Sequence, residues 1–480
     1  MATTKEPTLV EHRGIEYIPA HERYTTPFQL GMMWSSALFN VTNVVYGALV
    51  VSIGLNFGQA VIVILIANVT WILAGMASLP GPAAGTTAFA SSRAAFGIHG
   101  NKALAAFNWM TQVGYEILDL SIVVLAALAL LTKTGVHAGT GLKIVLVMAG
   151  AIVQSLLPLF GHRSILRTLK FLLAPFAVLF LILAVLVISK IHLGHAHPAG
   201  WALWFGGLAL AASASGLGWT VNASDFSRYI PETTSRSKIV AAVTVAGALP
   251  TTALMILGAA VATLLTNASD PISGLPHAFA SWFVVPYLLF VIVQLIAVNA
   301  LDLYSSGVTL QAVGVRVSRL QAVTIDAVIS GFGALAVILS GSFNAFLSDF
   351  LLFMIVWFAP WTAIYCIDYL LRRGRYDHDA LSATGTTGRY RRPGGLHTPG
   401  VIAQLAGMFM SLMCINTSVF VGPLCRALGG TDLSIPAGLV VGGVVYLLLA
   451  RRSVPAEVVE IVDLTGAGVV TPGVLSGVEA

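Results

Sequence analysis

The sequence predicts an all-α polytopic membrane protein with twelve transmembrane helices, arranged as a five-plus-five inverted repeat whose first and sixth helices are broken. The first observation is composition: the 480 residues are 57% hydrophobic and only 9% charged, whereas soluble domains carry about 25% charged residues. The second is the recurrence of apolar stretches of about 20 residues, which is the length of a membrane-crossing helix. The third is that two of these stretches, five helices apart, are interrupted by small and polar residues, a pattern typical of inverted-repeat transporters.

The apolar stretches divide the chain in order. The twelve expected spans are 28–51, 57–79, 103–132, 143–160, 166–189, 203–226, 239–266, 280–313, 321–341, 345–371, 400–422 and 434–450. The expected regions are a polar cytoplasmic N-terminal segment without a cleavable signal peptide (1–27), a transmembrane transport core of helices 1–10 (28–371), a basic cytoplasmic loop (372–399), helices 11 and 12 (400–450) and a cytoplasmic tail (451–480). We expect the tail to be poorly ordered from Val454.

The basic residues follow this topology. With the N-terminus in the cytoplasm, the inside segments hold 21 of the 25 Lys and Arg residues, and the outside loops hold Lys133, Lys143, Lys190 and Arg426. This positive-inside pattern predicts a multi-pass protein of the cell membrane with both termini cytoplasmic. The net charge of +5 is a consequence of topology, so no nucleic-acid partner is expected. The basic loop is either a flexible, solvated topogenic loop or a contact for anionic membrane lipid.

The sixth span turns small and polar in its middle. Residues 211–218 contain two serines and two glycines, and Trp219 follows them. Glycine and serine loosen a helix, and unpaired backbone groups within a bilayer are tolerated only where they line a cavity or are buried in protein. On this stretch alone two interpretations stay open, the substrate site of a secondary transporter and a close-packed helix interface.

The first span contains a second polar interruption. Asn40, Thr42 and Asn43 lie in mid-helix and are followed by Gly47, which suggests another broken helix. Asn40 is a candidate substrate-binding residue, and hydrogen bonding between helices is the alternative for both asparagines.

The third span places two acids in the membrane. Gln112, Tyr115, Glu116 and Asp119 have offsets of 0, 3, 4 and 7 and therefore share one helix face. No basic residue lies inside the twelve spans away from their ends, so these acids have no cationic partner there. They must be solvated, hydrogen-bonded, cation-loaded or protonated, which favours a proton-coupling role for Glu116 over a protonated acid that only ties two helices together.

The eighth span repeats this arrangement, because Asn299 and Asp302 are three residues apart on one face. Asp302 is a further candidate for proton coupling. The remaining acids are assigned structural roles: an ion pair or cap for Asp225 with Arg228, and caps or gates for Asp326, Asp349 and Asp368. The sequence contains no P-loop, no metal-ligand spacing and no nucleophile–base motif, so neither an enzyme nor a cofactor or metal is expected.

Six motifs together resemble the purine–cytosine permease family of nucleobase–cation symporters, over about 13–450. They are RGIEYIPAHER (13–23), SSRAAFGIHGN (91–101), TQVGY (111–115), GWTVNASDFSRYIP (218–231), NALDLYSSG (299–307) and APWTAIYCIDYLLRRGRYD (359–377). The resemblance implies the twelve-helix, leucine-transporter-like fold and symport of a flat heterocycle with Na⁺ or H⁺.

The resemblance also implies roles for single residues. Trp219 matches an aromatic residue that stacks on the ligand, and Tyr115 falls where relatives often have tryptophan for the opposite face. Gln112 and the backbone from Ser215 to Gly218 would hydrogen-bond the ring edge. Three further positions complete the implied site. Asn299 matches a polar residue of the eighth helix, and Asp119 and Asp302 stand where fungal-type relatives tend to carry asparagine.

Two departures from the family shape the functional prediction. Sodium-coupled relatives place two hydroxyl residues just before the Asn299 position, where this chain has Ala297 and Val298, so H⁺ is favoured over Na⁺ as the coupling ion. An ionised aspartate only accepts hydrogen bonds, whereas asparagine also donates, so the substrate presents more N–H donors than usual or is cationic, or one aspartate carries the proton. We therefore predict an importer of a nucleobase (cytosine or purine) or related heterocycle.

Several alternatives stay open. They are a symporter for hydantoin, allantoin, a thiamine-precursor pyrimidine or a cationic amine, a Na⁺-coupled symporter, and a receptor on the same fold that does not transport. The expected partners are the heterocyclic substrate, the coupling cation and membrane lipid, with no obligate protein partner.

Overall fold

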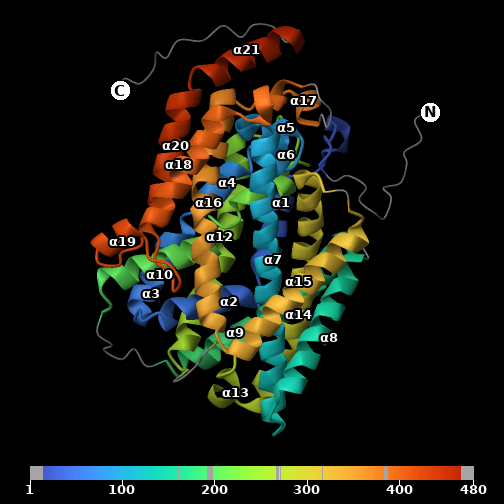
Figure 1. The fold of residues 1–480 in the computed structure, drawn as a ribbon. Helices are drawn as coiled ribbons and strands as arrows, with labels where there is room; N and C mark the ends of the chain where they lie inside the picture. Colours follow the sequence, from blue (N-terminus) through green and yellow to red (C-terminus); the bar gives the residue numbers. More distant parts are fainter. Residues whose placement is uncertain are drawn as a thin grey trace, which may run out of the picture.

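The computed structural model describes residues 15–159, 162–191, 198–265, 270, 272–315, 317–382 and 388–465. Within these ranges the regular secondary structure consists of α-helices and four short 3-10 helices, apart from one isolated bridge between Asn416 and Val421. The long helices form an elongated bundle, with α17 and α21 at one end and α13 at the other (Figure 1). The all-α membrane fold predicted from the sequence is confirmed.

The elements in chain order are η1 (Ala20–Glu22), α1 (Pro27–Leu38), α2 (Val41–Ser52), α3 (Phe57–Asn68), α4 (Trp71–Ala77), α5 (Pro80–Ala84), α6 (Ala88–Ser91), α7 (Arg93–Lys133), α8 (Thr140–Leu159), α9 (His162–Ile188), α10 (Trp201–Ala214), η2 (Thr220–Asn222), α11 (Ala223–Ser227), α12 (Arg236–Ala262), α13 (Leu275–Ala278), α14 (Ser281–Val313), α15 (Arg319–Ser340), α16 (Phe343–Arg372), α17 (His378–Ser382), η3 (Arg389–Arg391), η4 (Pro393–Gly395), α18 (Thr398–Cys414), α19 (Pro423–Ala427), α20 (Ser434–Ala450) and α21 (Ser453–Thr465). The close helix pairs include α7 with α14, α2 with α12, and α18 with α20.

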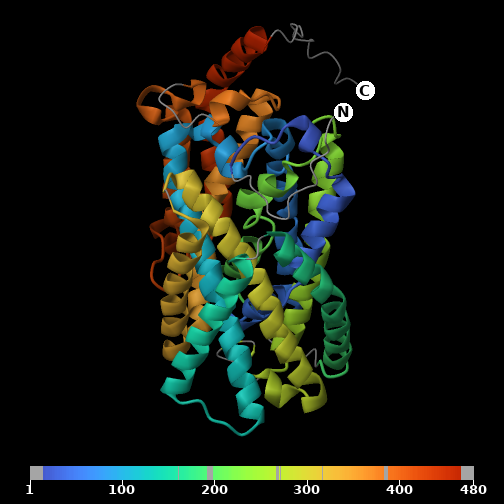
Figure 2. The same cartoon turned by 90° about the vertical axis from the view of Figure 1, so that its right-hand side faces the viewer.

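The membrane spans follow the predicted ones closely without establishing the number twelve. In the described part of the chain nine helices are long and apolar enough to cross a bilayer, and up to eleven if each of two bent helix pairs is one span. The sixth predicted span corresponds to α10, which has only 14 residues before its helix ends. Figure 2 shows the same bundle from the side, with α21 projecting from one end.

The first predicted span is broken, as its polar interruption suggested. The helices α1 and α2 meet at an angle of 60° around Phe39 and Asn40, at the start of that interruption. Gly47 lies inside α2, where a Cβ would be 1.8 Å from the carbonyl oxygen of Met255 in α12. Its physical role is to let two helix backbones approach each other closely.

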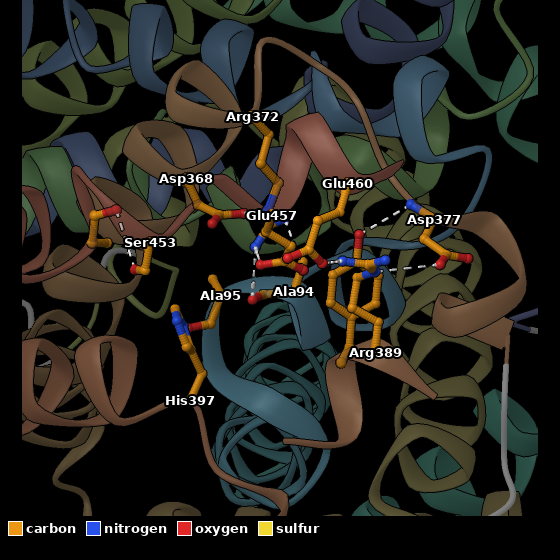
Figure 3. Close-up of polar contacts among 12 residues, drawn as sticks. Ala94, Ala95, Asp368, Arg372, Asp377, Arg389, His397, Ser453, Glu457 and Glu460 are labelled. Carbon is orange, nitrogen blue, oxygen red and sulfur yellow. Dashed lines mark hydrogen bonds and ion pairs between the residues drawn. The ribbon is translucent and has the colours of Figure 1, made fainter. Parts of the chain in front are cut away.

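The C-terminal prediction needs a correction. Residues from Val454 were expected to be poorly ordered, but α21 extends through residue 465 and packs on the end of α16. Glu457 lies beside the fully buried Arg372, with 3.4 Å between Oε1 and Nη1, and it also pairs with Arg392. Figure 3 shows Arg372 with Glu457 and Asp368, and Asp368 Oδ2 is 2.8 Å from Arg372 Nε. The ion pair between Glu457 and the buried Arg372 guanidinium therefore holds α21 in place, and a hydropathy profile alone does not predict this helix.

The same cluster orders part of the basic loop. The described residues of 372–399 form α17, η3 and η4, and Arg389 of η3 pairs with Glu460 of α21 and with Asp377 (Figure 3). The loop is therefore a structured cap in these stretches, which the prediction of a flexible loop did not anticipate.

Candidate functional site

Asparagine side chains close the break of the first helix. The helix α1 ends at Leu38, and Asn40 has extended backbone angles and caps α2, because its Oδ1 accepts a hydrogen bond from the Asn43 backbone N–H at 3.3 Å. Asn40 Nδ2 donates to the Ala37 carbonyl at 2.8 Å, and Asn43 Nδ2 donates to the Leu38 carbonyl at 2.6 Å. Asparagine favours helix caps because its short carboxamide reaches nearby backbone groups. Both ends of the Asn40 carboxamide are therefore engaged by the protein.

The sixth span is interrupted directly after Ala214. Ser215 has φ −113° and ψ −137°, and regular structure resumes only at η2. Gly216 lies against the connection between α3 and α4, where a Cβ would be 2.2 Å from the Trp71 backbone nitrogen. Ser215 Oγ donates to the Ala67 carbonyl at 3.3 Å. Small residues are thus required here for the broken segment to pack on a second irregular segment, and both interpretations of this stretch, close packing and cavity lining, apply to parts of it.

A cavity lies where these breaks meet α7 and α14. Its lining residues are Leu38, Asn40, Thr42, Asn43, Tyr46, Gln112, Tyr115, Asp119, Ala214, Gly218, Trp219, Asn222, Val298 and Asp302. The cavity, with its opening, comprises about 520 Å³ of space free of protein atoms.

The structure brings seven of the ten predicted site residues to this cavity and leaves three outside its lining. Those that line it are Asn40, Gln112, Tyr115, Asp119, Gly218, Trp219 and Asp302, and those that do not are Ser215, Glu116 and Asn299. Tyr46 is a lining residue that the sequence analysis missed, because a tyrosine within an apolar helix gives no signal of its own. Val298, singled out only for its lack of a side-chain oxygen, also lines the cavity.

Two aromatic rings of the lining are held edge-on by neighbouring rings. Tyr115 makes a T-shaped contact with Phe350, with ring centroids 5.1 Å apart, and Trp219 makes one with Trp34 at 5.6 Å. Trp34 in turn packs edge-on against Trp71 at 5.5 Å. Such contacts fix ring orientation, and a rigid aromatic surface is suited to a flat ligand.

The cavity also presents two carboxylates without a basic counterpart. Asp119 is 3% exposed, and its Oδ1 accepts a hydrogen bond from the Thr42 hydroxyl at 3.2 Å. None of the lining residues is Lys, Arg or His. Within the described residues, neither the Asp302 carboxylate nor the Gln112 carboxamide hydrogen-bonds to another residue. These groups are therefore available to a ligand, a water or an ion.

A second polar network lies behind the cavity, between α7, α8, α14 and α15. Asn299 Nδ2 donates to Gln154 Oε1 at 2.6 Å and to the Glu116 carbonyl at 3.3 Å, and Gln154 Nε2 donates to Ser330 Oγ at 3.3 Å. The Glu116 side chain is fully buried, and neither of its carboxylate oxygens has a hydrogen-bond partner among the residues that the structure covers. A buried carboxylate in this condition is unstable as an anion and requires a proton or another partner.

The weaker sequence candidates have structural partners. Asp225 accepts a hydrogen bond from the Ala88 backbone N–H at 2.7 Å, at the start of α6. Asp326 accepts from Trp109 Nε1 at 3.0 Å and from Ser306, and Asp349 accepts from Ser418. In the ranges described, no three His, Cys, Asp or Glu side chains are grouped so that they could hold a metal ion.

Comparisons with known proteins find relatives over most of the chain. Residues 17–438 match the family model described as permease for cytosine/purines, uracil, thiamine, allantoin. The chain is 28% identical to a putative purine-cytosine permease of Bacillus subtilis over 468 residues, covering 92% of this chain and 96% of that one. It is 25% identical to a purine-cytosine permease of Saccharomyces cerevisiae, covering 92% and 85%.

Solved structures share the fold. Mhp1, a nucleobase-cation-symport-1 family transporter in a closed conformation with bromovinylhydantoin bound, superimposes with a TM-score of 0.71 at 18% identity, covering 95% of this chain and 97% of that one. Its inward-facing conformation gives a TM-score of 0.73 at 16% identity, covering 94% and 95%.

Proposed function

Since this chain belongs to the family of permeases for cytosine and purines, uracil, thiamine and allantoin, we propose that it imports a nucleobase or a related flat heterocycle together with a proton. The family consists of membrane transporters, so the chain is a nucleobase-type, cation-coupled permease and not an enzyme. The observation that supports the proposal best is the cavity at the two helix breaks, which combines two oriented aromatic rings with free hydrogen-bonding groups.

In the proposed complex the heterocycle lies between Tyr115 and Trp219. Stacking on an aromatic surface accepts any flat ring, so selectivity must come from the ring edge. Gln112 both donates and accepts, whereas the carboxylates of Asp119 and Asp302 only accept when ionised. The backbone at Gly218, which also lines the cavity, adds further polar groups. Asn40 also lines the cavity; its carboxamide bonds to the backbone of the break through Oδ1 and through one N–H, which leaves the second N–H for the ligand.

The coupling proton is assigned to Asp302 or Glu116. Two carboxyl groups that share a cavity without a basic partner repel each other, and a proton on one of them removes the repulsion. Glu116 is buried without a hydrogen-bond partner in the described structure, and a proton would likewise remove its unfavourable negative charge. Ala297 is fully buried and, like Val298, has no side-chain oxygen to offer a sodium ion, which supports H⁺ over Na⁺.

A cationic amine is the second candidate substrate. The support for it is the same acidic cavity, whose lining contains two carboxylates and no basic residue. An amine would pair with Asp302 and Asp119 directly, and stacking on Trp219 would add a cation–π contact. For either substrate we propose that the protein lies in the cell membrane with both termini in the cytoplasm.

Thermal-shift screening of the purified protein tests the substrate class. A ligand that binds only the folded protein raises its apparent melting temperature by mass action. We expect cytosine, adenine, uracil or allantoin to stabilise the protein more at mildly acidic than at neutral pH, with no requirement for Na⁺. Stabilisation by amines alone would overturn the heterocycle assignment, and a strict need for Na⁺ would overturn the proton assignment.

Transport in proteoliposomes tests the coupling. We expect the wild-type protein to accumulate the stabilising ring above equilibrium when the outside is acidic, which a receptor that does not transport cannot do. The variants Asp302→Asn and Glu116→Gln keep the side-chain shape but cannot exchange a proton, so at least one should lose accumulation while exchange of labelled ring persists. If both retain pH-driven accumulation, neither acid is the coupling group.

A further inference from the structure

The break of the first helix leaves three consecutive carbonyl groups without helical partners. The last turn of any helix has carbonyls that receive no intrahelical hydrogen bond. In α1 they include those of Ala37, Leu38 and Phe39, because the chain leaves the helix after Leu38. Within a bilayer such groups must be satisfied, and in many transporters an unwound segment uses them to bind a metal cation.

In this protein each of the three carbonyls receives a side-chain amide. Two of the amides are local, from Asn40 to Ala37 and from Asn43 to Leu38, whose carbonyl also accepts the Asn40 backbone N–H at 2.9 Å. The third comes from another helix, because Gln294 Nε2 of α14 donates to the Phe39 carbonyl at 2.9 Å. All three donors present the positive end of an N–H bond to the oxygen atoms that a cation would otherwise approach.

Gln294 also binds the far side of the break. Its Oε1 accepts a hydrogen bond from the Val41 backbone N–H at 3.3 Å, and the side chain is only 3% exposed. One carboxamide thus joins the last carbonyl before Asn40 to the first N–H after it. The orientation of the amide is fixed by its partners, because the Phe39 carbonyl can only accept a hydrogen bond and the Val41 N–H can only donate one.

The position of Gln294 on α14 connects the break to the cavity. Gln294, Val298 and Asp302 are spaced by four residues and follow one face of the helix, and the latter two line the cavity. The buried Gln294 side chain therefore links Asp302 to the break, which contributes Asn40 and Thr42 to the same cavity.

We propose that Gln294 is a positioning residue whose carboxamide takes the place of a metal cation at the first-helix break. Because this side chain holds the two sides of the break together, the break does not require Na⁺. This inference rests on the proposed function, because its consequence is a substrate site whose geometry does not depend on sodium. It also explains how a symporter without hydroxyl side chains at Ala297 and Val298 keeps its broken helix together.

Sodium alone is the probe for the first test, so no substrate is needed. The apparent melting temperature of the purified wild-type protein should be the same in NaCl, KCl and choline chloride at equal ionic strength. Gln294→Glu replaces the donating amide by a carboxylate beside the Phe39 carbonyl, and it should gain a saturable stabilisation by Na⁺ over choline. Gln294→Met removes both hydrogen bonds, and it should lower the melting temperature equally in all three salts.

Gln404 provides the matched control. It is also buried, and its Nε2 donates to the Trp357 carbonyl at 3.0 Å between α18 and α16, away from the cavity lining. Gln404→Met should destabilise the protein without changing the KM for ring uptake, whereas Gln294→Met should raise this KM several-fold. Gln294→Glu should restore a lower KM only when Na⁺ is present.

The outcomes separate this inference from the proposed function. A specific, saturable stabilisation of the wild-type protein by Na⁺ would overturn the inference even if every ring binds. Equal effects of Gln294→Met and Gln404→Met on the KM would remove the positioning role. Failure of all rings to bind the wild-type protein would refute the proposed function, and the sodium comparison would still be decided by the melting temperatures.

Discussion

Replacing Gly47 by alanine tests how the cavity wall formed by α2 is held in place. A Cβ at Gly47 would lie 1.8 Å from the Met255 carbonyl oxygen, and a Cβ at Gly258 would lie 1.8 Å from the Val44 carbonyl oxygen. The two approaches are reciprocal, and neither partner can rotate away because both are backbone. Ordinary van der Waals contact begins at 3.4 Å, so either alanine must move the two helices apart by about 1.6 Å, the difference between these distances.

The energetic consequence of this separation is large. Overpacking a buried contact typically costs about 1–3 kcal/mol, and a gap of about 0.5–1 Å already forfeits a quarter to a half of the dispersion energy of the atoms that face it. We therefore expect each alanine to lower the free energy of unfolding by about 3 kcal/mol or more. Because α2 contributes Thr42 and Tyr46 to the cavity, ring binding should weaken as well.

Unfolding titrations in mixed micelles of detergent and SDS provide the measurement. Gly206→Ala is the matched control, because it lies in α10 with no atom within 4 Å of the added Cβ, and alanine favours the helix by about 0.8–1 kcal/mol. The double variant of Gly47 and Gly258 should be destabilised little more than either single variant, since one separation relieves both clashes. If Gly47→Ala is as stable as Gly206→Ala, α2 and α12 do not approach each other this closely at Gly47. Full additivity of the two substitutions would show that Gly47 and Gly258 do not lie at the same helix contact.

Two further predictions concern the ligand and the cytoplasmic cap. Trp219→Ala should weaken equilibrium binding of labelled cytosine or adenine by about 5- to 150-fold, because stacking on an aromatic side chain contributes about 1–3 kcal/mol per base; Trp219→Phe should retain most of the affinity, and equal affinities of the two variants would argue against stacking. Glu457→Gln should lower the free energy of unfolding by about 3–5 kcal/mol, because it leaves the buried Arg372 short of a counter-charge. Glu460→Gln, whose carboxylate is 68% exposed, should cost at most about 1 kcal/mol, and similar unfolding curves for the two glutamate variants would contradict a stabilising role of the buried cluster.

The sequence predicted the cavity well where polar groups interrupt apolar helices. Gln112, Asp119 and Asp302 were identified because hydrocarbon disfavours such side chains, and all three line the cavity. Helical spacing alone did not distinguish the residues that line the cavity from nearby residues on the same helix face that do not. Glu116 and Asn299 share a broad face with lining residues, yet both belong to the network behind the cavity, because adjacent positions on a face diverge toward different neighbouring helices.

Other features depended on long-range partners that periodicity does not reveal. The break at Asn40 is stabilised by Gln294, 253 residues away from Val41 in the chain. The local sequence shows the polar interruption at Asn40 but not this distant partner. The helix α21 had a readable signal, since Val454, Val458 and Ile461 are buried and recur at helical spacing. Its docking, however, depends on the buried ionic cluster, and a sequence does not show which charges meet.

The polar groups of the membrane region differ in how completely the protein satisfies them, and this difference separates structure from function. Asn40 and Gln294 each use both ends of their carboxamide on backbone groups of the first break. Gln112, Asp302 and Glu116 have no side-chain hydrogen bond to another residue in the described chain. An unsatisfied polar group in the membrane interior lowers stability, and it is kept where a ligand or proton completes it during the working cycle. The satisfied amides therefore hold the break of the first helix in a fixed geometry, and the three unsatisfied groups are where substrate and proton are expected to bind.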